Sequence, residues 1–321
     1  MSDRGGGTRV LLADIGGTNA RFAVLAGSQL GPIAHIAVAG HARFADALGA
    51  FGAQTRQKFD AAVLAVAGVV AEGRCALTNN PWIVDAAELR AEFGLGRVHL
   101  INDFEAIARA LPHLSGDDLY RIGGGAPDKD APMAVLGPGT GLGVAAFLPH
   151  GGVVLHSEGG HATLAGGSPR EDAVIAHLRS RFGHVSAERA LSGPGLENLY
   201  RAIAALDGVK VPERNAAGIT RAAAAGECAV CRAALDMFCA LLGDFAGNVA
   251  LTFGAGGGIY IAGGIVPRLH EELLRSAFRT RFEGKGRMRA YVEPIPVNVV
   301  MHKDPAFVGL KALAQALPRQ D

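Results

Sequence analysis

The feature that most constrains this fold is a strand, glycine turn, strand pattern that occurs twice in the chain. The first copy is the apolar run Val10–Asp14, the glycines Gly16 and Gly17, and a second apolar run at Ala20–Leu25. The second copy is Met133–Phe147, roughly 120 residues later. An apolar run that stops at glycines and then resumes predicts a hairpin. Its repetition indicates an internal duplication, with two similar lobes that bring both glycine turns to one cleft.

The remaining apolar pattern alternates strands with helices, which is typical of the α/β class. Because 321 residues exceed the roughly 250–300 at which a single core stops growing, two lobes are expected. We expect a small lobe at 1–110, completed by a C-terminal helix at 303–321, and a large lobe at 111–302. Further strands are expected at Pro32–Ala39, Ala61–Ala67, Gly152–His156 and Gly256–Gly264, and helices at Ala42–Lys58, Pro169–Phe182, Gly195–Ala205, Ala223–Thr252 and from near Val266.

Charge and hydropathy exclude several classes of partner. With 31 basic and 30 acidic side chains, the chain offers no electrostatic footprint for nucleic acid or an anionic membrane. Its longest apolar runs fall short of the ~20 residues that span a bilayer, and the N-terminus lacks the apolar core of a signal peptide. We therefore expect a cytoplasmic protein that binds small molecules.

The four cysteines are too few for a disulfide framework in a chain of this length. The pair Cys228-x-x-Cys231 lies in an Ala/Leu-rich helical stretch, with no second pair to complete a zinc site. We interpret it as core packing.

Both glycine turns are candidates for phosphate binding, because backbone amides without a neighbouring Cβ can approach an anion closely. The chain has neither G-x-x-x-x-G-K-[ST] nor G-x-G-x-x-G, which disfavours the P-loop and dinucleotide folds. An ordinary tight hairpin remains the alternative for each turn. The predicted nucleotide-binding residues are Ala13, Asp14, Ile15, Gly16, Gly17, Thr18 and Asn19 in the first copy, and Gly137, Gly139, Thr140 and Gly141 in the second.

Asp14 ends an otherwise apolar strand, where an unpaired carboxylate is costly unless it faces a cleft or a cation. We interpret it as a Mg²⁺ partner that acts through water. A turn-capping aspartate that accepts hydrogen bonds from nearby amides is the alternative.

Five segments together resemble the bacterial glucokinase family. They follow one another in order over nearly the whole chain: Asp14–Arg21, Leu100–Ala108, Leu136–Val144, Ser157–Thr163 and Ser186–Gly195. The resemblance implies a two-lobed actin-like fold, a duplicated ribonuclease-H-like unit with an interlobe cleft. It also implies a homodimer that transfers the γ-phosphoryl group of ATP to the 6-hydroxyl of glucose with the help of Mg²⁺.

Asn102 and Asp103 follow the apolar run Val98–Ile101, so they are expected at the carboxyl end of a strand, where ligands bind. A carboxylate there can accept the proton of the attacking sugar hydroxyl, and the resemblance implies the same role. We predict Asp103 as the catalytic base and both residues as substrate ligands. The alternative for Asp103 is the N-cap of the helix that follows.

Glu158 and His161 are separated by two glycines, which oppose the helix that a metal-binding Glu-x-x-His pair requires. A carboxylate with an imidazole on a loop suits a polyol, because together they accept and donate hydrogen bonds to hydroxyls. The resemblance assigns Glu158, His161 and also Glu188 to glucose. It further implies nucleotide contact by Leu191–Gly195 and by the turn at Gly263 and Gly264, for which a plain loop or glycine-lined strand is the alternative.

Three other functions compete with this prediction. Sugar kinases of the related ROK group usually carry a Cys/His zinc site, but no cysteine lies between Cys75 and Cys228. A sugar-responsive regulator would lack chemistry, yet Asp103 is present and no helix-turn-helix is expected before Val10. An actin-like filament protein would leave the Glu158, His161 and Glu188 set without a purpose.

Overall fold

The computed structural model describes residues 8–77 and 80–317. The predicted small lobe and C-terminal helix therefore extend beyond the described residues at 1–7 and 318–321. The chain divides into two compact units. The first contains the chain up to Leu114 and again from Lys303, and the second contains Ser115–His302.

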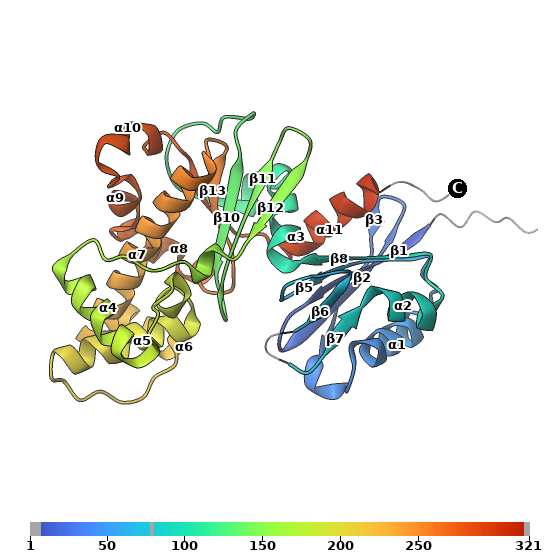
Figure 1. Cartoon of the computed structure of the whole chain (residues 1–321), viewed down its shortest axis with the longest axis horizontal. Helices are drawn as coiled ribbons and strands as arrows, with labels where there is room; N and C mark the ends of the chain where they lie inside the picture. The colour runs from blue at the N-terminus through green and yellow to red at the C-terminus, as the bar shows by residue number, and fades with distance from the viewer. Residues whose placement is uncertain (1–7, 78–79, 318–321) are drawn as a thin grey trace, which may run out of the picture. The chain divides into compact units, whose positions relative to one another are not determined.

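The first unit is built on a mixed sheet whose central strands are parallel. The hairpin predicted around Gly16 is confirmed, since β1 and β2 pair antiparallel and Asp14 faces Arg21. The order is β3-β2-β1-β5-β8, with β4 also on β2 (Figure 1). The strands are β1 (Arg9–Ile15), β2 (Asn19–Ala26), β3 (Gln29–Leu30), β4 (Ala34–Ala37), β5 (Ala61–Val66) and β8 (Arg97–Asn102), with a separate hairpin of β6 (Arg74–Ala76) and β7 (Ile83–Asp85).

Helices cover both faces of this sheet (Figure 1). Alternate residues of β1 point to opposite sides, as the pleat of a strand requires. Leu11 packs in the core beneath α1 and α2, whereas Leu12 packs against α3 and α11. The helices are α1 (Phe44–Thr55), α2 (Ala86–Phe93), α3 (Asp103–Ala110) and α11 (Pro305–Ala316). Burial on both faces explains why these strands read as continuous apolar runs.

The second unit repeats the arrangement of the first. Its sheet has the order β12-β11-β10-β13-β14-β9, so a hairpin is again followed by two parallel strands. The second predicted hairpin is thereby confirmed, and the matching order supports an internal duplication. The strands are β9 (Leu119–Gly123), β10 (Met133–Pro138), β11 (Leu142–Leu148), β12 (Val153–Ser157), β13 (Gly258–Ile261) and β14 (Val297–Val300).

The longer helices of the second unit begin at residues whose side chains cap them. Ser168 accepts a hydrogen bond from the Glu171 amide, and Ser192 accepts one from the Gly195 amide, so each serine fixes a first turn. The predicted helix at Pro169–Phe182 has the bounds expected. The helices are α4 (Pro169–Phe182), α5 (Gly193–Leu206), α6 (Ala216–Ala224), α7 (Ala229–Phe253), α8 (His270–Arg275), α9 (Phe278–Glu283) and α10 (Arg289–Val292).

The long helix expected at Ala223–Thr252 is confirmed over most of its length as α7 (Ala229–Phe253), but its expected start is wrong, because Ala223 and Ala224 belong to a separate helix, α6. Gly226 has a φ of +70°, a left-handed conformation that ends α6, and α7 starts afresh after Cys228. By length and composition α7 is apolar enough to cross a membrane, but 67% of its most apolar window is buried inside the protein. It is the central helix of this unit's core.

Candidate functional site

The β1–β2 turn of the first unit is held by hydrogen bonds from three directions. Within the turn, the Gly16 amide donates to the Asn19 carbonyl at 3.0 Å, and from β4's side Val38 donates to the Thr18 carbonyl at 3.0 Å. The Asn80 side-chain amide lies 3.4 Å from the carbonyls of both Gly16 and Gly17. A backbone fixed in this way can present its amides to an anion without reorganising.

Among the other residues predicted here, the side chains of Ala13 and Ile15 are fully buried. Both face the core beneath α1 and α2, so any contact they make with a nucleotide is through the backbone. Thr18 and Asn19 are exposed at the tip of the turn.

Asp14 forms an ion pair with Arg21, its neighbour across the hairpin, with 3.2 Å between Oδ2 and Nη1. Arg21 also lies 3.6 Å from Asp304, which precedes α11. Burial raises the pKa of the Asp14 carboxyl; the Arg21 guanidinium opposes this shift, and the nearby Asp304 adds to it. The surroundings of Asp14 therefore disfavour the ionised form of its carboxyl, and a perturbed pKa of this kind is common at functional sites.

Two carboxylates that share one guanidinium can accept a further cation. In the described part of the chain no group of three or more His, Cys, Asp or Glu side chains is arranged to cage a metal. Mg²⁺ commonly keeps most of its waters and takes only one or two protein carboxylates together with substrate phosphates. Asp14, with its side chain 18% exposed, fits that mode of binding.

Asn102, and not Asp103, caps α3. The Asn102 side-chain oxygen accepts hydrogen bonds from the amides of Phe104 at 2.8 Å and Glu105 at 3.3 Å. Its side-chain nitrogen donates to the Gly68 carbonyl at 3.1 Å, which ties the end of β8 to the loop after β5. The capping alternative for Asp103 is therefore wrong, because the helix begins one residue earlier than expected. The Asp103 carboxylate itself accepts a hydrogen bond from the Phe104 amide at 2.9 Å.

In the second unit, three glycine-bearing segments meet at the carboxyl end of β10. The Gly139 amide donates to the Gly141 carbonyl, and the Gly193 amide, at the start of α5, donates to the Gly139 carbonyl, both at 2.8 Å. Gly263 has a φ of +89° and lies directly against the Pro138 carbonyl, so no other residue fits there. Gly263 and Gly264 are exposed, whereas Gly137 is buried within the sheet.

Glu158, His161 and Glu188 come together beside this turn. The His161 Nε2 atom lies 3.8 Å from a Glu158 oxygen and 4.0 Å from a Glu188 oxygen. Glu158 precedes a single 3-10 turn, Gly159–His161, and His161 is its last residue, in place of the open loop expected. Glu188 also accepts a hydrogen bond from the Leu142 amide at 2.9 Å. Two carboxylates around one imidazole offer the acceptors and donor that a polyol needs.

Sequence reasoning missed Arg21 as the partner of Asp14, although the hairpin register pairs the two directly. It also missed Asn80, whose contact with Gly16 joins residues 64 positions apart, and no local pattern signals such a contact.

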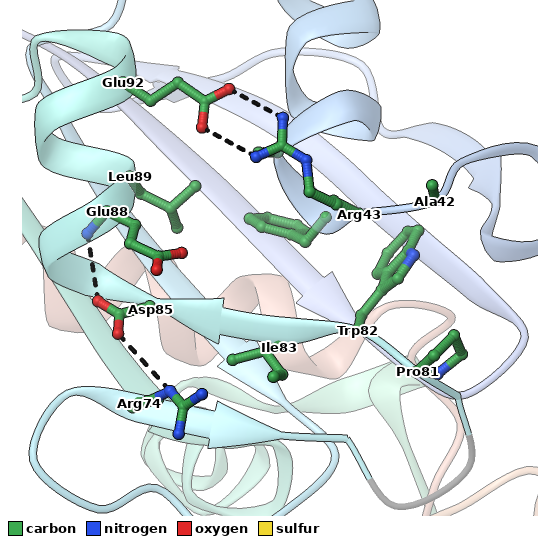
Figure 2. A pocket seen from close by; sticks show the side chains of 12 residues that line it. Ala42, Arg43, Arg74, Pro81, Trp82, Ile83, Asp85, Glu88, Leu89 and Glu92 are labelled. Carbon is green, nitrogen blue, oxygen red and sulfur yellow. Dashed lines mark hydrogen bonds and ion pairs between the residues drawn. The ribbon is translucent and has the colours of Figure 1, made fainter.

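A separate cavity of about 230 Å³ lies in the first unit, and none of the predicted site residues lines it. Figure 2 shows its charged side chains directed toward one another, with Arg43 paired to Glu92 at 3.3 Å and Arg74 to Asp85 at 3.7 Å. Trp82 forms part of its wall and donates its backbone amide to the Asn80 side chain at 2.8 Å. The wall of the cavity is therefore connected to the glycine turn through Asn80. Arg43 and Arg74 are both engaged in ion pairs, so we do not assign a catalytic role to this cavity.

Comparison with known proteins identifies the family. The family model for glucokinase matches residues 11–317. The chain is 45% identical to the glucokinase of Paramagnetospirillum magneticum, with 95% of this chain and 97% of that protein covered. It is 46% identical to the glucokinase of Chromobacterium violaceum, with 97% and 91% covered.

A solved structure agrees with these relatives. The crystal structure of a glucokinase from an Antarctic psychrotroph superposes with a TM-score of 0.86 at 37% identity, covering 96% of this chain and 99% of that one. The α/β fold implied by the resemblance is thereby confirmed. The chain therefore belongs to the glucokinase family and is an ATP-dependent hexose kinase.

Proposed function

We propose that this kinase phosphorylates the 6-hydroxyl of glucose with Asp103 as the general base. Asp103 stands at the first position of α3, where the helix dipole stabilises a carboxylate. Asn102 holds the helix start in place through its cap and its bond to Gly68, so the adjacent carboxylate sits on a fixed backbone. In a loose phosphoryl-transfer transition state, such a group orients the hydroxyl and receives its proton as the bond to phosphorus forms.

The glycine turns bind the phosphates of ATP in this proposal. The amides of residues 14–19 and of residues 139–141 act as donors, and Gly263 and Gly264 contact the nucleoside end. Bound Mg²⁺ supplies positive charge to the phosphate oxygens, and Asp14 holds it through water. Arg21 orients the Asp14 carboxylate through their ion pair and opposes the rise in its pKa that burial causes.

Glu158, His161 and Glu188, with Asn102 and Asp103, hold the sugar hydroxyls. The observation that carries this assignment is the bond from the Leu142 amide to Glu188, because Leu142 directly follows the Gly139–Gly141 turn. The Glu188 carboxylate is thus hydrogen-bonded to the first residue of β11, which follows the phosphate turn, and lies 4.0 Å from the His161 imidazole. Sites that bond specific hydroxyls discriminate strongly against analogues that lack them.

A coupled assay of ADP release with ATP and glucose tests the base. Asp103→Asn should fold normally and lose about 10²–10⁴-fold in kcat, the usual contribution of a general base. Glu105→Gln, which removes a carboxylate two residues along the same helix, serves as the control and should retain kcat. Near-normal turnover by Asp103→Asn would exclude Asp103 as the base.

We also propose that the enzyme works in the cytoplasm as a homodimer and that its product enters glycolysis. The four free thiols are compatible with a reducing compartment. Light scattering on the purified chain, with and without glucose, measures the mass directly, and a monomer at all concentrations would exclude the dimer.

A further inference from the structure

The proposed phosphoryl transfer makes no use of a pair of cysteines at the start of α7. Cys228 is the N-cap residue of this 25-residue helix, and Cys231 stands on its first turn. The Cys231 backbone amide donates a hydrogen bond to the Cys228 sulfur at 3.2 Å. The interpretation of this pair as core packing is confirmed, since Cys231 is buried in the core of the second unit and Cys228 packs against that core while also capping the start of α7.

The two sulfurs differ in access to solvent. Cys231 is fully buried in the core of the second unit, whereas Cys228 is half-buried and follows two exposed residues, Gly226 and Glu227. A reagent in solution therefore meets Cys228 first. Cys75 and Cys239, the remaining cysteines, are both 1% exposed.

The charges around Cys228 favour its thiolate. Arg214, from the segment between α5 and α6, contributes a positive charge, and its Nε is buried without a hydrogen-bond partner among the described residues. Burial alone would raise the pKa of Cys228, but hydrogen bonds from Cys231 and the charge of Arg214 outweigh burial and lower it. Burial and the bond to Cys228 raise the pKa of Cys231 to about 11. Tyr200 of α5 also faces the pair, and burial raises its pKa, so it stays a neutral phenol.

This asymmetry is that of a dithiol with one attacking and one resolving sulfur. An accessible thiolate at a helix N-terminus is a good nucleophile, and a protonated neighbour within reach can displace the group that the first sulfur acquires. We propose that Cys228 and Cys231 form a redox-active dithiol that exchanges with small disulfides such as glutathione disulfide.

The reaction balances without any further reagent. The Cys228 thiolate attacks one sulfur of the small disulfide, which forms a mixed disulfide and expels one thiolate. Cys231 then loses its proton and attacks the Cys228 sulfur, which forms the Cys228–Cys231 disulfide and expels the second thiolate. Two electrons pass from the protein to the small disulfide, and the two thiolates leave as thiols with the two protons of the dithiol.

The test uses the full chain incubated with glutathione disulfide and analysed by mass spectrometry after alkylation of the remaining thiols. In wild type, Cys228 and Cys231 should both become resistant to alkylation without a stable glutathione adduct, and dithiothreitol should restore their alkylation. Cys231→Ser should trap one glutathione on Cys228, and Cys228→Ser should react at neither position. Cys239→Ser is the matched control and should behave as wild type.

A second measurement needs no cysteine variant. The rate of iodoacetamide reaction at Cys228, followed against pH, should have its midpoint below that of an ordinary thiol. Arg214→Gln should move this midpoint upward, and Arg214→Lys should restore most of the shift. The proposal is overturned if Cys228 reacts no faster than Cys75 at pH 7, or if Cys231→Ser forms no mixed disulfide.

Discussion

The Glu188 carboxylate accepts a hydrogen bond from the Leu142 amide at 2.9 Å and at the same time occupies the space where a Cβ at Gly141 would lie, so a side chain there would require Glu188 to move. The carboxylate is 29% exposed, and the oxygen that accepts from Leu142 also lies 4.0 Å from the His161 Nε2 atom. A residue proposed to bind sugar is thus built into the edge of a turn proposed to bind phosphate.

Replacing Glu188 should affect sugar binding more than nucleotide binding. In Glu188→Gln the amide oxygen can still accept from Leu142, but the charge that strengthens bonds to hydroxyls is lost. A hydrogen bond to a charged group contributes about 1.5–3 kcal/mol, so KM for glucose should rise roughly 10- to 100-fold. Steady-state kinetics with either substrate varied measures this. Glu213→Gln, at an exposed position, is the control, and an unchanged KM for glucose in Glu188→Gln would remove Glu188 from the sugar site.

A side chain at Gly141 should disturb the same contact from the other side. The Cβ of Gly141→Ala would meet the Glu188 carboxylate directly, and overpacking of this kind typically costs about 1–3 kcal/mol. We expect kcat/KM for both substrates to fall about 10-fold or more. Gly40→Ala is the matched control, because a Cβ there meets nothing within 4 Å.

A double-mutant cycle identifies the cause of that loss. In a Glu188→Ala background the clash is absent, so Gly141→Ala should cost much less than it does in wild type. Additive effects of the two substitutions would show that the turn is disturbed in some other way.

Asp14 should lower the stability of the protein at neutral pH. Because its folded-state pKa is raised above the unfolded value, the folded protein binds this proton more tightly than the unfolded chain does. The stability it contributes is complete below the unfolded pKa of about 3.9 and is lost as the pH rises through the folded pKa. Asp14→Asn should therefore resist urea at least as well as wild type at pH 7 while kcat falls.

The pH dependence of unfolding tests whether the Asp14 carboxylate destabilises the fold through its charge or stabilises it through its ion pair. The difference in unfolding free energy between Asp14→Asn and wild type should move in favour of the variant as the pH rises from about 4 to 7. Arg21 keeps Asp304 as a partner in the variant, so its charge is not left alone. A variant that unfolds at clearly lower urea than wild type at pH 7 would show that the carboxylate is stabilising.

The local sequence was enough to predict the two hairpins and α4. Each hairpin has apolar runs interrupted by glycines, and α4 begins after a capping serine. The break at Gly226 was missed, since alanines on either side continue the helical period without interruption. The short strands β6 and β7 were missed because three residues carry too little period to detect.

In the candidate site, too, some residues are identifiable from the local sequence and others only from contacts between distant segments. Asp14 and Asp103 are visible in sequence as carboxylates at the ends of apolar strands. The contact between Glu188 and Leu142 joins residues 46 positions apart, and it depends on how a 3-10 turn packs against β11. Without the resemblance, nothing in the local sequence separates Glu188 from an ordinary surface carboxylate.

An ionic network away from the proposed chemistry should control acid stability. Glu171 is 4% exposed and accepts two hydrogen bonds from Arg281 at 2.7 Å, and Arg281 also pairs with Asp244 on α7. Burial raises the pKa of Glu171, but the bonds from Arg281 and from the Gly167 amide outweigh burial and lower it. This network joins the start of α4 to α7 and α9.

Since the folded-state pKa of Glu171 is lowered, its contribution to stability is present above the unfolded value of about 4.3 and is lost as the pH falls through the folded pKa. Glu171→Gln leaves Arg281 with Asp244 alone and should cost about 3 kcal/mol of unfolding free energy at pH 7, the lower range for breaking a buried pair. Glu271→Gln, which breaks an exposed pair with Arg275, should cost under about 1 kcal/mol. Urea unfolding at pH 7 and pH 3 measures both, and the Glu171→Gln deficit should shrink at the lower pH. A deficit that stays constant over that range would show that packing, and not the charge of Glu171, is responsible.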